Sequence, residues 1–114
     1  MNMVAIRLAL AFKNGKKFRA TTSGTDGQTV WYHHNKIAWR NPDGSISLTL
    51  AGWGTITTRS RLNAICDVLF GTRPFYQRNH TQYWNDEEIS TTRVITYHIL
   101  DEVETIITKE REAA

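Results

Sequence analysis

The stretch WYHHNKIAWRNPDGSISLTLAGWGTITTRSRLN, residues 31–63, decides the fold. It holds three of the four tryptophans, the adjacent pair His33-His34 and four Lys or Arg, arranged in short β-rich runs that lead into a helix-like segment. Residues 41–44 (NPDG) predict a tight turn, because proline presets φ at the second position and glycine accepts the left-handed conformation. Strands are predicted on both sides of this turn, at residues 29–34, at 36–40 after a break near Asn35, and at 45–50.

The strand predicted at 45–50 alternates Ser and Thr with aliphatic residues, which predicts one buried face and one polar face. Glycines on both sides of Trp53 mark a bend, and residues 55–58 add a short strand. A helix from Ser60 to Phe70 follows, with Thr58 or Ser60 as N-cap and Gly71 as its C′ residue. Its apolar stripe includes the single cysteine, Cys66, which we expect to be a small buried hydrophobe.

The two ends of the chain are predicted from periodicity. Residues 3–12 alternate with period two, so we expect a strand, a type I′ turn at Asn14-Gly15 and a returning strand at 16–22. Residues 23–28 (SGTDGQ) are typical of a loop. At the other end, aliphatic residues from Ile95 to Ile106 recur at helical spacing, which favours a helix over 92–110, although the Thr, Val, Ile and Tyr after residue 91 favour a strand locally.

Residues 75–84 (FYQRNHTQYW) predict a hairpin that turns at Asn79-His80 and places Phe75 and Tyr76 opposite Tyr83 and Trp84. The acidic residues 86–88 follow as a solvated run. With 114 residues, 40% of them apolar and 22% charged, the whole chain, 1–114, is predicted to be one domain. The expected fold is α+β: a single antiparallel sheet of about five to seven short strands with two helices packed on one face.

Composition also bounds the location and the partners. No apolar run has the length of a membrane span and the N-terminus does not have a signal-peptide layout, so we expect a cytoplasmic protein. Residues 1–85 carry eleven Lys and Arg against three acids, a balance of +8, whereas 86–114 carry three against eight, a balance of −5. Such a split indicates either a basic body that meets a polyanion or an acidic segment that complements the basic sheet within the molecule.

The four histidines do not form a metal motif. His33 and His34 would point to opposite faces of a strand, and no cysteine pair, HExxH motif or acidic loop accompanies them, so no metal and no other cofactor is expected. A general acid/base pair of His33 or His34 with His80 would suit a small metal-free nuclease. Hydrogen-bonded surface histidines are the more ordinary interpretation, and the sequence leaves both open.

Basic and aromatic side chains alternate along the β-rich segments, which is typical of proteins that hold single-stranded nucleic acid on an open sheet. We expect a non-enzymatic binding module in which cations contact phosphates and tryptophans stack on bases. Tryptophan and tyrosine also form cores and protein interfaces, so a protein partner with an acidic surface, or a homodimer, fits the same pattern. The residues predicted to bind nucleic acid are Lys36, Trp39, Arg40, Trp53, Arg59, Arg61 and Arg78.

Residues 37–63 resemble a group of small uncharacterised proteins of bacteriophages and mobile elements. The shared features are Ile37-Ala38 with Arg40, the Asp43-Gly44 turn, Trp53, and the pair Thr57-Thr58 before a helix. The resemblance implies a phage-type accessory protein that works in the cytoplasm of the bacterial host. Its partner would be nucleic acid, or a host protein to which it binds as an inhibitor or adaptor.

Overall fold

The computed structural model describes residues 2–99 and 105–109 and has two helices, a seven-stranded antiparallel sheet and a separate three-stranded antiparallel sheet. The large sheet has the order β1-β2-β3-β4-β5-β9-β10 and the small one the order β6-β7-β8. The prediction of an α+β fold is confirmed, but the single sheet is wrong. The elements are α1 (Met3–Lys13), β1 (Phe18–Arg19), β2 (Ser23–Thr25), β3 (Thr29–Tyr32), β4 (Asn35–Arg40), β5 (Ile46–Thr49), α2 (Ile56–Phe70), β6 (Phe75–Arg78), β7 (Thr81–Trp84), β8 (Glu87–Ile89), β9 (Val94–Ile99) and β10 (Thr105–Lys109).

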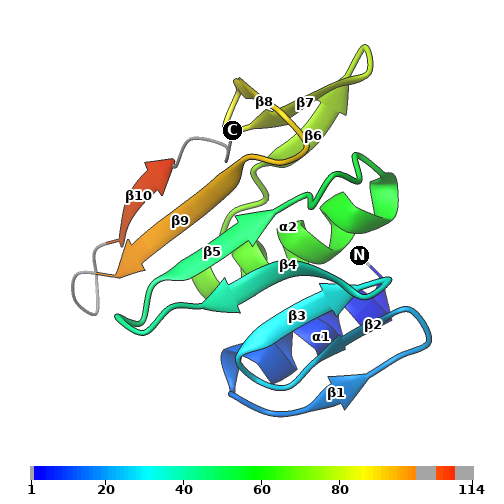
Figure 1. Cartoon of the computed structure of the whole chain (residues 1–114), viewed down its shortest axis with the longest axis vertical. Coiled ribbons are helices and arrows are strands. Elements are labelled where there is room, and N and C mark those ends of the chain that lie inside the picture. Colours follow the sequence, from blue (N-terminus) through cyan, green and yellow to red (C-terminus); the bar gives the residue numbers. More distant parts are fainter. Residues whose placement is uncertain (1, 100–104, 110–114) are drawn as a thin grey trace.

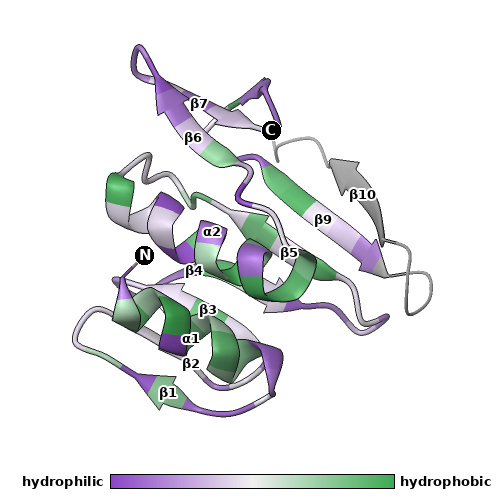
Figure 2. Ribbon diagram, turned by 180° about the vertical axis from the view of Figure 1, so that it is seen from behind, coloured by the Kyte–Doolittle hydropathy of each residue, from purple (hydrophilic) through white to green (hydrophobic). Residues whose placement is uncertain are grey.

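The large sheet and the helices form two layers. Figure 1 looks onto the sheet, with β4 and β5 in front of α2 and β3 in front of α1, and Figure 2 shows the helices from behind. Contacts between the layers agree with this view: Phe70 of α2 stacks on Tyr97 of β9 with ring centroids 4.1 Å apart. The small sheet contacts the large one where Trp84 Nε1 donates a hydrogen bond to the Tyr97 hydroxyl at 3.1 Å. One face of the large sheet is therefore covered by helices, and we call the opposite face the outer face.

The first element is a helix, so the predicted strand at 3–12 is wrong. Ala5, Leu8, Ala9 and Phe12 are buried, at spacings of three and four. Alanine, leucine, methionine and arginine are strong helix formers, and an alternation whose second positions are alanine or arginine also fits a helix. Asn14-Gly15 ends this helix in a Schellman motif, in which the amide of residue 15 donates to Phe12 O and that of residue 16 to Ala11 O. The predicted return at 16–22 is reduced to the two residues of β1, and the predicted loop at 23–28 begins with β2.

The predicted C-terminal helix over 92–110 is also wrong. The chain instead forms β9 and β10, which pair with each other, while residues 100–104 and 110 lie outside the described residues. Strand β9 pairs with β5 and buries Ile95 and Tyr97. Because isoleucine and tyrosine pack well in a sheet, this tertiary pairing prevails over the helical spacing of the aliphatic residues.

The middle of the chain follows the predictions closely. Helix α2 is confirmed and ends at Gly71 with φ +75°, but it begins at Ile56 with Thr55 as N-cap, so the predicted strand at 55–58 is wrong. The hairpin β6–β7 has the predicted register, with Phe75 opposite Trp84 and Tyr76 opposite Tyr83. Cys66 is buried as expected, and burial raises the pKa of its thiol to about 12.

Strand β5 departs from the predicted alternation, because all four of its residues are buried. It lies between β4 and β9, and its polar side chains are satisfied by neighbouring strands: the hydroxyls of Ser47 and Thr96 are hydrogen-bonded at 2.8 Å. The alternation of buried and exposed residues is therefore harder to predict for a central strand, because the neighbouring strands on both sides cover its polar side chains.

Candidate nucleic-acid interface on the outer face

The register of the large sheet determines which side chains share the outer face. Val30 lies opposite Ala38 and Ala38 opposite Leu48, and these fully buried residues form the core under the helices. Apart from Ile37, which is buried at a bulge, their neighbours in each strand therefore point outward. In this way the pairs Arg19↔Gly24, Gly24↔Trp31 and Trp31↔Lys36 form one row across β1 to β4, and Trp39↔Ser47↔Thr96 forms a second row across β4, β5 and β9.

A β-bulge shapes the first row. The pairing of β3 with β4 shifts between Val30 and Trp31, so that Ile37 is an extra residue in β4 and Trp31 lies opposite Lys36. Without this extra residue Lys36 would point to the opposite face, because one residue of shift reverses every later side chain. The bulge thus brings the ammonium group of Lys36 to the face that carries both tryptophans, Trp31 and Trp39.

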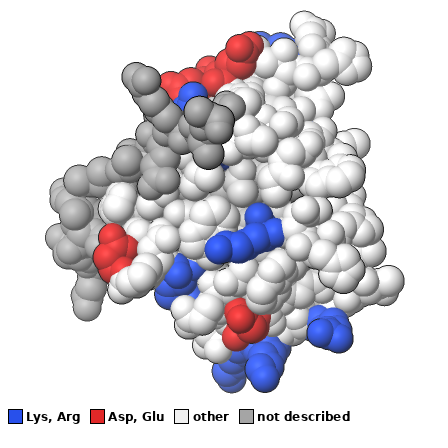
Figure 3. Space-filling model, in the orientation of Figure 1, with Lys and Arg blue, Asp and Glu red and all other residues white. Residues whose placement is uncertain are grey.

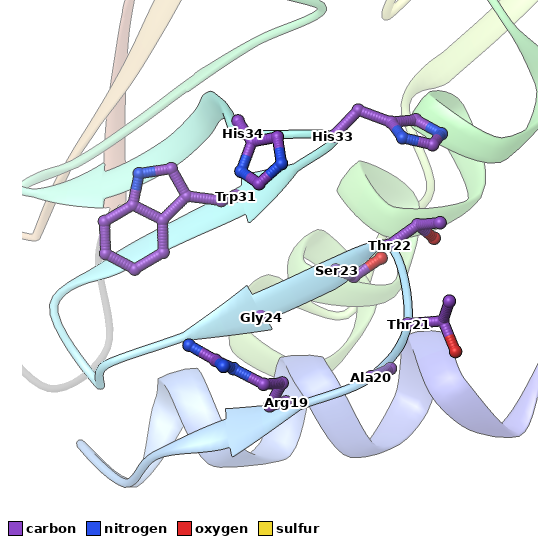
Figure 4. A pocket seen from close by; sticks show the side chains of 9 residues that line it. All are labelled: Arg19, Ala20, Thr21, Thr22, Ser23, Gly24, Trp31, His33 and His34. Atoms are coloured by element: carbon purple, nitrogen blue, oxygen red, sulfur yellow. The ribbon is translucent and has the colours of Figure 1, made fainter.

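A hollow of about 410 Å³ lies at the β1–β3 end of this face. Gly24 leaves the backbone of β2 uncovered at its floor, and the side chains of Arg19 and Trp31 stand on either side (Figure 4). Trp31 is half-buried and Arg19 is exposed, and no described residue accepts a hydrogen bond from the guanidinium of Arg19. The hollow is lined by Arg19, Ala20, Thr21, Thr22, Ser23, Gly24, Trp31, His33 and His34.

Trp39 is held in place on the same face. Its indole Nε1 donates to Asn41 Oδ1 at 3.1 Å, and Asn41 Nδ2 donates in turn to the hydroxyls of Ser45 and Ser47, both at 2.9 Å. The ammonium of Lys36 lies 4.5 Å from the centroid of the indole ring, a cation–π contact. Trp39 is thus a preorganised ring with a cation already on it, whereas Trp31 has no ring or cation contact among the described residues.

The strands of this face carry Lys and Arg, and the turn carboxylate of Asp43 borders the second row, with Oδ2 3.8 Å from Nδ1 of His98 in β9. None of the residues in β1 to β5 or β9 is acidic. The two acids nearest in the sequence, Asp26 and Asp43, stabilise turns: both accept backbone N–H bonds, which lower the pKa of each carboxyl, and at Asp43 the Ser45 hydroxyl has the largest effect. Figure 3 shows this face with basic groups at its centre and lower part and the acidic groups in separate patches.

Two of the predicted cations are tied to the backbone. Arg40 points toward the helices, where Nη1 donates to Gly27 O at 2.7 Å and Nη2 to Phe12 O at 3.3 Å. Arg59, in the first turn of α2, donates from Nη1 to Gly54 O at 3.0 Å and to the side chains of Gln77 and Gln82 at the same distance. Both connect separate parts of the fold and do not lie on the outer face.

The remaining predicted residues are also dispersed. Arg61 is 6% exposed beneath the sheet, Arg78 is exposed on β6 with its guanidinium 5.8 Å from the ring of Tyr76, and Trp53 is 51% exposed in the loop before α2. Of the seven predicted residues, the structure therefore brings only Lys36 and Trp39 together on one face. Arg19 and Trp31, which are not among the seven, also lie on this face. Their position follows from the strand register, which a single sequence specifies only once the hairpins are known.

Three of the four histidines lie in turns, and the fourth, His98, lies in β9. His33 and His34 have φ values of 49° and 66° and connect β3 to β4, so the predicted strand ends at Tyr32. Asn79 and His80 have matching values, 49° and 66°, in the β6–β7 turn of the other sheet. Figure 1 shows these two turns well apart, so the described structure does not bring His80 to His33 or His34. In the part of the chain that is described, no three His, Cys, Asp or Glu residues gather as a metal site.

Comparison with known proteins gives one match. The sequence profile of the Kyanoviridae Gp96 protein family, a phage family, matches residues 1–101. No curated protein and no solved structure matches the chain. Within the described residues, neither helix has both the length and the apolar character needed to cross a bilayer.

Proposed function

The chain belongs to the Kyanoviridae Gp96 protein family, and from this premise we propose that it is a phage protein that binds single-stranded nucleic acid on the outer face of its large sheet. The observation that carries the proposal is the hollow at Gly24, where the uncovered indole of Trp31 lies beside the unpaired guanidinium of Arg19. A base would stack on Trp31 above the backbone of β2. Arg19 and Lys36, at the two ends of the same row, would contact the flanking phosphates.

A single strand fits this face better than a duplex does. Rings that lie on an open sheet can stack only on bases that are not already stacked in a helix. Stacking of a base on an aromatic side chain contributes about 1–3 kcal/mol and tolerates any base. The proposed activity is thus binding with little sequence preference and contains no catalytic step. Each phosphate that a cation neutralises should contribute roughly −0.7 to the slope of log K against log salt.

The test is fluorescence anisotropy of a labelled oligothymidylate and of a labelled duplex, titrated at two salt concentrations. Arg19→Gln, Trp31→Ala and Lys36→Gln should each weaken binding of the single strand. Matched controls are Arg78→Gln, an exposed cation on the small sheet, and Trp53→Ala, an exposed tryptophan outside the two rows. No binding at low salt, or equal losses for the controls, would contradict the proposal.

A second candidate is docking to a host protein, and one observation favours it. Trp53 and Ile56 are 51% and 78% exposed within four residues at the entry to α2, and exposed large apolar groups mark protein interfaces. In that case Trp53→Ala with Ile56→Ser would abolish capture of a host partner while the outer-face variants would not. The same variants thus separate the two functions.

A further inference from the structure

Arg61, on the second turn of α2, is a buried cation without a counter-charge. It is 6% exposed, and none of the ion pairs among the described residues includes it. Its Nε donates to Ser23 Oγ at 3.0 Å, and its guanidinium carbon lies 6.0 Å from the ring centroid of Tyr32. Burial lowers the pKa of Arg61, whereas Tyr32 opposes that shift.

An arrangement of this kind is costly unless a partner is added. Buried charges in proteins are paired, because desolvation of an ion costs several kcal/mol that a single neutral hydrogen bond does not recover. The contacts of Arg61 account for Nε alone: among the described residues, no acceptor binds Nη1 or Nη2. Neither of these two nitrogens is fully buried, so both remain accessible to solvent.

The side chains named beside Arg61 include no carboxylate. Ser23 and Tyr32 have hydroxyls, and the ring of His33 packs on Tyr32 with centroids 4.4 Å apart. In Figure 4, His33 and Thr22 point away from Trp31 at the end of the β2–β3 pair, toward α2.

We propose that Arg61 is the centre of a second binding site, between α2 and the end of β2–β3, that takes a phosphate group. A guanidinium presents two parallel N–H bonds that match the oxygens of a phosphate, and Nη1 and Nη2 are the donors still free to do so. The Tyr32 hydroxyl would be a further donor. Arg61 lies beneath the sheet and Arg19 lies on the outer face, so the two sites use different cations, although Thr22, Ser23 and His33 at the end of β2–β3 border both.

The experiment measures thermal unfolding of the full chain in inorganic phosphate and in sodium chloride of equal ionic strength. Phosphate at about ten times its Kd should raise the Tm of the wild type by roughly 5 °C above the chloride value. Arg61→Met, which keeps an unbranched apolar side chain and removes the charge, should lose this rise. Arg78→Met, the control, should keep it.

A second measurement does not depend on a stable variant. The Nε–Hε signal of Arg61 in a nitrogen-15 NMR spectrum should shift as wild-type protein is titrated with inorganic phosphate. Tetrathymidylate with and without a 5′-phosphate then identifies the source: a stronger shift with the phosphorylated strand indicates a strand end, and equal shifts indicate backbone phosphates. An unmoved Arg61 signal in every titration, or an equal Tm rise for Arg61→Met, would overturn the proposal.

The two sites can fail separately. Trp31→Ala should leave the phosphate-induced rise in Tm unchanged, because Trp31 does not contact Arg61. Loss of the rise in Trp31→Ala would show that phosphate acts through the outer face and would overturn the assignment to Arg61.

Discussion

Two pairs of cations in this molecule have the same charge and opposite roles. Arg40 donates to Gly27 O at 2.7 Å and Phe12 O at 3.3 Å, and Arg59 donates at 3.0 Å to Gly54 O and to the side chains of Gln77 and Gln82, so both connect separate segments of the fold. Arg19 and Lys36 lie on the outer face without a hydrogen-bond acceptor among the described residues, and Lys36 rests on an indole ring. The difference shows that the position of a residue in the fold, rather than its charge, decides whether a cation stabilises the fold or remains available to a ligand.

The largest expected effect concerns the tied cations. Arg59→Ala should lower the free energy of unfolding by about 2–3 kcal/mol, because a hydrogen bond from a charged donor contributes about 1.5–3 kcal/mol and three acceptors each lose one hydrogen bond. Urea unfolding followed by circular dichroism measures the change. Arg78→Ala, at an exposed site, should change stability by less than about 0.5 kcal/mol. Equal effects at the two sites would remove the distinction between tied and free cations.

Next in size is the ring at the hollow. Trp31→Ala should weaken binding of a single strand by about 1–3 kcal/mol, which is roughly 5- to 150-fold, through loss of one stacked base. Anisotropy titrations measure it, and Trp53→Ala provides the matched comparison. If Trp53→Ala has the larger effect, the loop before α2 is the binding surface instead.

A smaller effect is expected for the free cation over Trp39. Lys36→Gln should reduce the magnitude of the salt slope by roughly 0.7, which corresponds to one phosphate contact. Its effect on stability should be slight, since the ammonium is exposed. An unchanged slope would show that Lys36 serves only to cover the indole.

The smallest effect on stability is expected for Asp26, an acidic residue in a turn. Backbone N–H bonds from Gln28 and Thr29 lower the pKa of Asp26 below its ordinary value of 3.8. The carboxylate therefore adds stability above the unfolded pKa, near 3.8, and this contribution is lost as the pH falls through the lower folded pKa. Asp26→Asn should lower stability slightly at neutral pH, and the difference from the wild type should vanish in acid. A difference that persists below pH 2 would contradict this origin.

The sequence predicted secondary-structure elements correctly where the local residues favour a single conformation. The Asn41-Pro42 turn, the glycine stop of α2 and the register of β6–β7 each rest on residues that a turn or cap requires. Prediction failed in α1 and β9, where the pattern fits both a helix and a strand. In α1 the alanines fit either period, and in β9 the pairing with β5 decides.

The candidate site could be predicted only in part. Basic and aromatic residues indicated the β3–β4 segment, and Lys36 and Trp39 do share its outer face. Arg40 points inward because of the register of β4, which the pattern of a single sequence does not define. The exposure of Trp31 depends in turn on the glycine opposite it in β2.

The most direct test of the central claim uses the four tryptophans as separate reporters. In a nitrogen-15 spectrum, the indole N–H signals of Trp31, Trp39, Trp53 and Trp84 are assigned by substitution and followed during titration with unlabelled oligothymidylate. We expect the largest shift for the indole signal of Trp31, a smaller one for Trp39, and none for Trp53 or for Trp84, which is 4% exposed in the core. Shifts confined to Trp53, or no shift at all at low salt, would contradict it.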